Sequence, residues 1–256
     1  MTKRVMDNDY SQDPETIKWL RKAAEKGHAT AQYYLGVCYE EGRGVAMDKQ
    51  EAFKWFRKAA EKGNTYAQYN LGVCYLKGIG TAKNEQKAVK WLCKAAEKGD
   101  AFAQYNLAMC YLNGYGIAKD EQKAAKWFLW AAKQGDVDAQ YNLGVSYYKG
   151  TGIAKNEQKA VKWFCKAAKQ GHADAQYNLG MCYSKGLGVA KDELKAAKCF
   201  LRAAKQGVAK AQYNLGLCYC EGRGIAKDEL KATKWLRRAA KQGDDYAIIA
   251  LQSLQG

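Results

Sequence analysis

The sequence contains a single proline, only two histidines and no hydrophobic run of membrane-spanning length. The rarity of proline argues against a loop-rich fold and against proline-rich linkers. A membrane helix needs about 20 consecutive apolar residues, and no stretch approaches that length. Residues 1–20 are polar and mixed in charge, without the apolar segment of a secretory signal peptide. These absences predict a soluble cytoplasmic protein, with export by a signal-independent route left open.

The residues that most often carry metal or acid–base chemistry are scarce and poorly spaced for it. His28 and His172 form no pair at a defined spacing, and the nine cysteines include no Cys-x-x-Cys motif. A catalytic nucleophile would need a base and an orienting partner, and none is indicated. We therefore expect no enzymatic activity, no metal ion, no cofactor and no small-molecule substrate.

The sequence does contain a strong internal repeat. Apolar residues make up 48% of the chain and charged residues 27%, which is typical of a globular protein. Within it, a glutamine recurs every 36 residues in the frame Ala-Gln-Tyr-x-Leu, without slippage. These glutamines are Gln32, Gln68, Gln104, Gln140, Gln176 and Gln212.

The repeats predict one continuous solenoid domain over residues 1–256. Single-helix half-repeats are expected at both ends, at 13–27 and 244–256, with Asp13 and Pro14 starting the first helix. Fourteen helices follow from this count. The full repeats are expected at 28–63, 64–99, 100–135, 136–171, 172–207 and 208–243.

Each repeat is predicted to form two helices. In the fourth, a first helix is expected over 136–148, where apolar residues recur at helical spacing, and the Gly-Thr-Gly segment at 150–152 ends it. Asn156 is expected to cap a second helix whose apolar face includes Trp163 and Phe164, and Gly171 ends it. Neither helix alone buries its apolar stripe, so neighbouring repeats must stack.

These motifs resemble those of the Sel1-like repeat, a relative of the tetratricopeptide repeat. The resemblance rests on Ala-x-x-Ala-Gln-Tyr-Asn-Leu-Gly-x-x-Tyr, followed by Gly-x-Gly, Lys-Ala, Lys-Trp-Phe and Ala-Ala-Lys-Gln-Gly, and it covers residues 28–243. It implies an all-α, right-handed superhelical α/α solenoid. It also implies an adaptor that binds protein partners, because members mostly act in this way, many of them in bacteria that interact with eukaryotic hosts.

Five cysteines occupy one position of the repeat, three residues after the core leucine, and are expected to pack in the core as reduced thiols. Stacked helices lie about 8–10 Å apart, beyond the Cα spacing of a disulfide, so neighbouring members should not bond. A cysteine-rich, disulfide-stapled branch of the family is linked to penicillin binding. Its cysteine positions are occupied here by alanines and glutamines, so a β-lactamase-like hydrolase is only a distant third interpretation. The five cysteines are Cys38, Cys74, Cys110, Cys182 and Cys218, with Ser146 at the sixth position.

An asparagine precedes the core leucine in five repeats. In the related tetratricopeptide fold the aligned asparagine lines the inner groove and contacts bound peptide, so the resemblance implies a concave ladder that is available to a partner. An amide both donates and accepts, which suits an extended peptide backbone. The alternative is that each asparagine bonds a neighbouring repeat or local backbone. The ladder comprises Asn70, Asn106, Asn142, Asn178 and Asn214.

Residues that flank this asparagine ladder vary between repeats. A constant amide with changing neighbours is what a graded peptide groove would need, although drift on a solvated face would produce the same pattern. The flanking candidates for partner binding are Tyr66 and Phe102, four residues before the ladder, and Lys77, Lys149 and Lys185, seven residues after it.

Charge supports a second interpretation. The chain carries 42 basic and 26 acidic residues, a net charge of +16, and much of the excess falls in rows on the second helices, such as Lys159, Lys162 and Lys166. Such rows could bind nucleic acid or an anionic membrane. They lack interleaved aromatic residues, and a solvated convex face is the simpler explanation. We therefore expect a protein–protein interaction scaffold, with electrostatic binding as the alternative.

Overall fold

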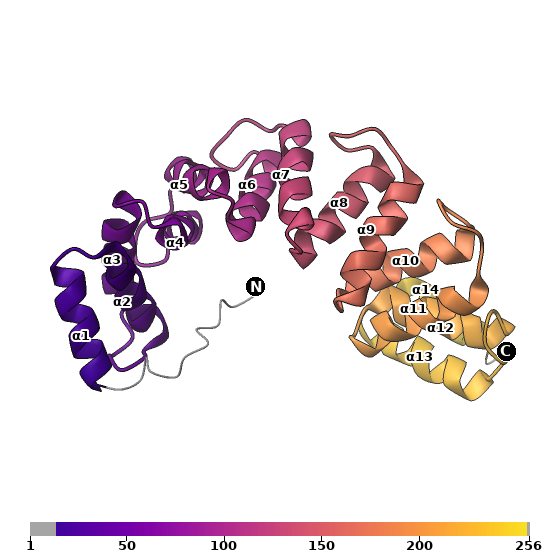
Figure 1. Cartoon of the computed structure of the whole chain (residues 1–256). Coiled ribbons are helices and arrows are strands. Elements are labelled where there is room, and N and C mark those ends of the chain that lie inside the picture. Colours follow the sequence, from indigo (N-terminus) through magenta and orange to yellow (C-terminus); the bar gives the residue numbers. More distant parts are fainter. Residues whose placement is uncertain (1–13, 255–256) are drawn as a thin grey trace. The chain divides into compact units, whose positions relative to one another are not determined.

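The computed structural model describes residues 14–254, and Figure 1 shows their arrangement. Over this range the chain forms fourteen helices and no strand, which confirms the predicted all-α solenoid class. Asp13, expected to start the first helix, and residues 255–256 of the last half-repeat lie outside the described residues. The helices are α1 Pro14–Glu25, α2 Ala29–Glu41, α3 Lys49–Glu61, α4 Thr65–Lys77, α5 Glu85–Glu97, α6 Ala101–Asn113, α7 Glu121–Lys133, α8 Val137–Lys149, α9 Glu157–Lys169, α10 Ala173–Lys185, α11 Glu193–Lys205, α12 Ala209–Glu221, α13 Glu229–Lys241 and α14 Asp245–Ser253.

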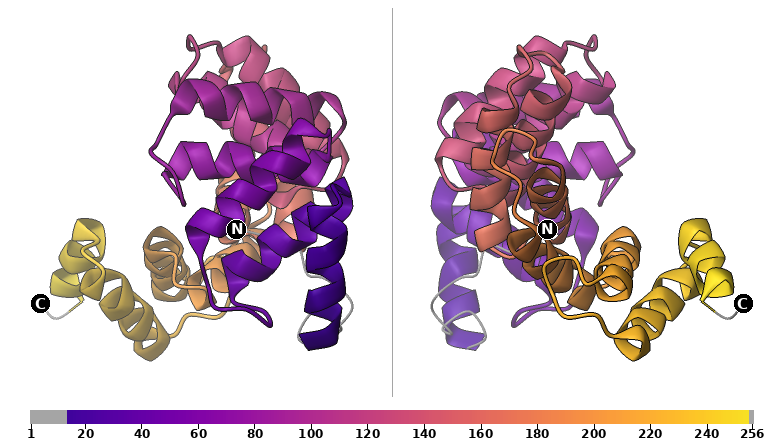
Figure 2. Two further views of the ribbon diagram at one scale, coloured as in Figure 1. Left: turned by 90° about the vertical axis from the view of Figure 1, so that its left-hand side faces the viewer. Right: turned by 90° about the vertical axis from the view of Figure 1, so that its right-hand side faces the viewer.

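The helices group into two compact units, residues 1–131 and 132–256, with the boundary inside α7. In the first unit, consecutive helices from α1 to α6 pack on one another. In the second, α8 to α14 do the same (Figures 1 and 2). The prediction of a single continuous domain stays a prediction. Among the described helices, none is long and apolar enough to cross a membrane.

Local signals in the sequence define where helices begin and end. Asn156 caps α9 as predicted, because its side chain accepts a hydrogen bond from the backbone N–H of Lys159 at 2.8 Å. At the other end of a first helix, Gly150 follows α8 with φ of 77°, a left-handed conformation that favours glycine. Its backbone N–H donates to the carbonyl of Ser146 at 2.8 Å. Asn156 thus marks the start of α9, and Gly150 marks the end of α8.

Close packing between the two helices of a repeat forms the core. In the fourth repeat, Gly144 of α8 lies so near Phe164 of α9 that a Cβ at Gly144 would be 2.6 Å from the aromatic ring. Phe164 is fully buried, whereas Trp163, predicted on the same apolar face, is half-buried at its edge, with the Lys166 ammonium 4.3 Å from the ring centroid. The phenylalanine therefore belongs to the core and the tryptophan to its border.

A buried glutamine connects consecutive repeats. Each glutamine of the Ala-Gln-Tyr frame is 4–6% exposed, and its side-chain Nε2 donates to the backbone carbonyl eight residues earlier, near the end of the preceding second helix. The bond thus joins a first helix to the repeat before it, at a helix-end carbonyl that also accepts from the backbone N–H of the glycine three residues later. The pairs are Gln32–Ala24 at 3.0 Å, Gln68–Ala60 at 3.2 Å, Gln104–Ala96 at 3.1 Å, Gln140–Ala132 at 3.2 Å, Gln176–Ala168 at 3.2 Å and Gln212–Ala204 at 3.1 Å.

The five cysteines of the repeated position are buried, as predicted, and all nine cysteines are free thiols. Burial raises the pKa of Cys74 to about 12 and those of Cys110 and Cys182 to about 11. Ser146 is buried at the sixth position, and its hydroxyl donates to the carbonyl of Asn142 at 3.0 Å. The position therefore accepts a small side chain in a dry environment.

We predict that Gly144→Val lowers the free energy of unfolding by about 1–3 kcal/mol, because the added side chain collides with the Phe164 ring. Urea unfolding followed by circular dichroism measures the change. Gly144→Ala should cost less, since Ala108 stands at the equivalent position of the third repeat. An unchanged unfolding free energy for Gly144→Val would contradict the close packing.

We also predict that native protein at about pH 8 exposes at most its four half-buried cysteines to a thiol reagent. The raised pKa values keep Cys74, Cys110 and Cys182 protonated there, so their reaction should accelerate only as the pH approaches about 11. Thiol titration before and after denaturation tests this. Nine reactive thiols in the native state would refute buried packing, and fewer than nine after non-reducing denaturation would reveal disulfides.

Candidate peptide-binding face

The asparagine ladder lies on the first helices of five repeats, at α4, α6, α8, α10 and α12. Each member precedes a buried leucine and is itself half-buried. This position follows from helix geometry, because adjacent residues are rotated by about 100° around the axis. The ladder therefore runs along the edge of the core, where amides meet solvent.

The structure shows what several of these amides bind within the chain. Asn106, Asn142 and Asn214 each donate Nδ2–H to the backbone carbonyl four residues earlier in the same helix, at 2.8 Å. Asn178 instead lies beside the Tyr141 hydroxyl of the preceding repeat. The alternative of a bond to local backbone is thus realised at three of the five ladder positions. A primary amide has two N–H groups and an acceptor oxygen, so one such bond leaves it capacity for another partner.

In the first unit, the ladder is flanked by aromatic rings. Tyr66 is 48% exposed and packs against Tyr33 of the preceding repeat, with ring centroids 5.7 Å apart. Phe102 is half-buried and packs in the same way against Tyr69, at 6.0 Å. These spacings are those of favourable aromatic pairs. Two of the predicted flanking residues thus form part of a repeated, partly exposed aromatic surface beside the amides.

In the second unit, the same flanking position is polar. Asp138 lies 3.6 Å from Nε2 of His172, which stacks on Tyr141 with ring centroids 4.4 Å apart. Burial, followed by the negative charge of Asp174, raises the pKa of Tyr141. Sequence reasoning missed this cluster, because nothing local marks that His172 reaches Tyr141. The one signal in the sequence is that Tyr141 and His172 are 31 residues apart, which is close to the 36-residue period and places them in adjacent repeats.

The three flanking lysines lie farther along the first helices. Lys77, Lys149 and Lys185 are the last residues of α4, α8 and α10, and their side chains are exposed. Seven residues separate each from its ladder asparagine, about 10 Å along a helix. They are therefore placed at the rim of the face and not against the amides.

The lysine rows on the second helices differ from the prediction in one respect. Aromatic rings do accompany them: Lys159 lies 5.5 Å from the Tyr147 ring centroid, and Lys166 lies 4.3 Å from that of Trp163. The tyrosine belongs to the neighbouring first helix, so the row alone did not reveal it. Cation–π contacts and short-range ion pairs, such as Lys195–Asp192 at 3.0 Å, engage many of these cations.

Seven tandem matches to the Sel1 repeat family model cover the described helices from α1 to α13. They span residues 11–28, 29–64, 65–100, 101–136, 137–172, 173–208 and 209–244, each full repeat beginning one residue after its predicted boundary. The fold is thus a solenoid of helix-turn-helix repeats. The chain belongs to the Sel1 repeat family, whose members are commonly protein-interaction scaffolds.

Solved structures of bacterial relatives agree with this assignment. One is c5321, a protective antigen present in uropathogenic Escherichia coli strains and described as displaying an SLR fold, with a TM-score of 0.89 and 36% identity. The similarity covers 94% of this chain and 52% of that one, so the chain spans about half the length of this relative. A Sel1 repeat protein from Oxalobacter formigenes has a TM-score of 0.78 and 37% identity, over 94% and 70% of the two chains. No curated protein sequence matches the chain.

We predict that replacing Asn106, Asn142 and Asn178 together by alanine leaves helix content and melting temperature nearly unchanged. Each lost hydrogen bond contributes about 0.5–1.5 kcal/mol, and alanine recovers up to about 0.7 kcal/mol through its higher helix propensity. Circular dichroism melting measures both quantities. Unfolding of the triple variant would show that the ladder is structural.

Proposed function

We propose that the chain is a protein–protein interaction scaffold that holds an extended partner peptide or a partner domain along the asparagine ladder, in a concave groove. The observation that carries this proposal is a half-buried amide at the same edge of the core in successive repeats. Bonds to local backbone orient amides such as those of Asn106 and Asn142 before a partner arrives. Pre-orientation lowers the entropic cost of binding.

The flanking residues extend the proposal to specificity. Tyr66 and Phe102 would contact apolar side chains of the partner, and Lys77, Lys149 and Lys185 would contact acidic ones at the rim. First helices about 10 Å apart match roughly three residues of extended peptide per repeat. The proposal involves no catalysis and no cofactor. It includes a role in bacterium–host interaction, supported by the description of the Escherichia coli relative as a protective antigen.

A second candidate function is electrostatic binding of nucleic acid or an anionic membrane by the lysine rows. One observation favours it: exposed cations of α11 and α13, such as Lys198, Lys234 and Arg237, form no ion pair with the described residues. Elsewhere, rings and carboxylates already engage the rows. We favour the ladder because each of its amides keeps further hydrogen-bonding capacity, whereas many cations of the rows already have partners within the chain.

We predict that the wild-type chain retains a protein or peptide partner at about 0.15 M salt and that the triple alanine variant of the ladder retains less. Capture from a lysate with identification by mass spectrometry tests this. A variant with Gln86, Gln122 and Gln158 replaced by alanine is the matched control, since it removes three exposed amides from second helices and should bind normally.

The same experiment separates the two functions. Nucleic-acid affinity falls steeply with salt because binding releases counterions, whereas a peptide held by amides and rings is far less sensitive. Sub-micromolar nucleic-acid binding at about 0.15 M salt, lost when Lys159, Lys162 and Lys166 are reversed in charge but kept in the ladder variant, would favour the second candidate.

A further inference from the structure

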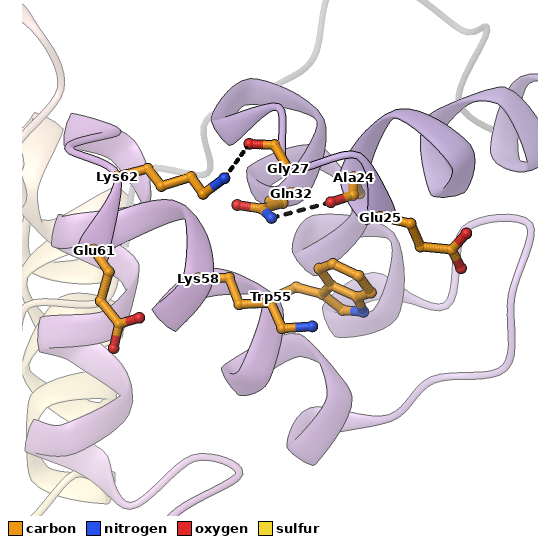
Figure 3. Close-up of a pocket in the computed structure, with 8 residues that line it drawn as sticks. All are labelled: Ala24, Glu25, Gly27, Gln32, Trp55, Lys58, Glu61 and Lys62. Carbon is orange, nitrogen blue, oxygen red and sulfur yellow. Dashed lines mark hydrogen bonds between the residues drawn. The ribbon is translucent and has the colours of Figure 1, made fainter.

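A cavity of about 510 Å³ lies between α1 and α3, beside the start of α2. We call it the α1–α3 pocket, and Figure 3 shows the side chains around it. It lies on the second helices, away from the asparagine ladder, and no part of the proposed function uses it. The pocket is lined by Ala24, Glu25, Gly27, Gln32, Trp55, Lys58, Glu61 and Lys62.

One buried atom in the pocket wall is unusual. Gln32 is only 4% exposed, and its Nε2 donates to the carbonyl of Ala24 at 3.0 Å. Its Oε1 is buried and accepts no hydrogen bond from the described residues. Burying an acceptor without a donor costs about 1–3 kcal/mol of folding free energy, and a ligand that donates a hydrogen bond to this oxygen would recover part of that cost.

The second unit shows how the equivalent oxygens are satisfied. There, Oε1 of Gln140, Gln176 and Gln212 accepts from a second glutamine 30 residues later, at 2.8–2.9 Å. The first of these donors, Gln170, uses the same Nε2 to reach the carbonyl of Gly135 at 3.3 Å. Two acceptors, a glutamine oxygen and a glycine carbonyl, therefore lie within reach of one nitrogen.

In the first two repeats, a lysine replaces the second glutamine. Lys62 donates to the carbonyl of Gly27 at 2.6 Å and leaves Oε1 of Gln32 unpaired. The next repeat has the same arrangement: Lys98 donates to the carbonyl of Gly63 at 2.8 Å, and Oε1 of Gln68 is buried without a donor. Lysine in place of glutamine at this position thus leaves the buried oxygen without a donor, whereas glutamine supplies one.

The remaining pocket residues define the chemistry of a ligand. The Lys58 ammonium lies 4.1 Å from the Trp55 ring centroid, so a second cation and an indole face the cavity. Figure 3 shows the carboxylates of Glu25 and Glu61 pointing away from Gln32. The inner wall therefore offers ammonium donors, one orphan acceptor beside the Lys62 ammonium, and an apolar ring.

We propose that the α1–α3 pocket binds a carboxylate whose adjacent carbon carries an amide N–H. This group occurs at the C-terminus of a peptide and in free N-acylamino acids. Its N–H would donate to Oε1 of Gln32, its carboxylate would accept from Lys62 and Lys58, and its side chain would lie on Trp55. The Lys62 side chain, exposed and held by one hydrogen bond, turns from Gly27 toward the carboxylate to admit the ligand.

The donor requirement separates this ligand from simple anions. Sulfate could bind the two ammonium groups but has no hydrogen to donate to Gln32. A C-terminal amide could satisfy Gln32 but would lose the charge that attracts the lysines. Only a ligand with both features satisfies the orphan oxygen and the cations together.

The test uses the full chain with N-acetyl-leucine, its C-terminal amide N-acetyl-leucinamide, and a pentapeptide ending in leucine, titrated by calorimetry. N-acetyl-leucine should bind at least about tenfold more tightly than its amide. Tighter binding of the pentapeptide would identify a protein C-terminus as the source, and tighter binding of N-acetyl-leucine a small molecule. No binding by either acid, or equal binding of acid and amide, would overturn the proposal.

Lys62→Gln combined with Lys98→Gln is the decisive variant. It recreates the arrangement of Gln170, so it should satisfy both orphan oxygens, keep or raise the melting temperature, and weaken acid binding at least about tenfold. A folded variant that binds as the wild type would refute the site. The triple alanine variant of the ladder should bind N-acetyl-leucine normally, so failure here and failure of the proposed function are distinguishable.

Discussion

The hydrogen bond from each buried glutamine to the end of the preceding second helix is the interaction on which the stacking of repeats depends. It recurs between Gln68 and Ala60 and between Gln176 and Ala168 with nearly the same length. Because the amide is buried, losing the bond would leave a buried N–H donor unpaired. The glutamine therefore fixes how one repeat stacks on the next. Equivalent residues of successive repeats consequently lie on the same face of the solenoid.

The amide nitrogen of this glutamine has an equivalent partner in every repeat, whereas the partner of its oxygen changes between repeats. The nitrogen always fastens the preceding helix, whereas the oxygen is satisfied by Gln170, Gln206 and Gln242 in the second unit. In the first two repeats it has no donor among the described residues. The bond from the nitrogen is thus the same in every repeat. Whether the oxygen has a donor depends on the residue 30 positions later, which is a glutamine in the second unit and a lysine in the first two repeats.

Sequence periodicity predicted the positions of the ladder and its flanks, but not their partners. The half-burial of Asn142 follows from its place beside Leu143 in a helix. Its bond to the carbonyl of Asp138 does not, because an amide at that position can rotate toward its own helix or toward a neighbour. Asn178 lies beside the Tyr141 hydroxyl of the preceding repeat. The rotamer is decided by what the adjacent repeat offers.

The sequence by itself determined the helices, their caps, the glycine turns and the residues that face the core. These features depend on a few neighbouring residues and on a period that repeats without slippage. Tertiary structure alone decided which side chains meet across repeats, such as His172 on Tyr141, and that Lys62 bonds Gly27 instead of Gln32. Such contacts join residues about one helix-pair apart in sequence, and their formation depends on distances that exist only after the helices have packed.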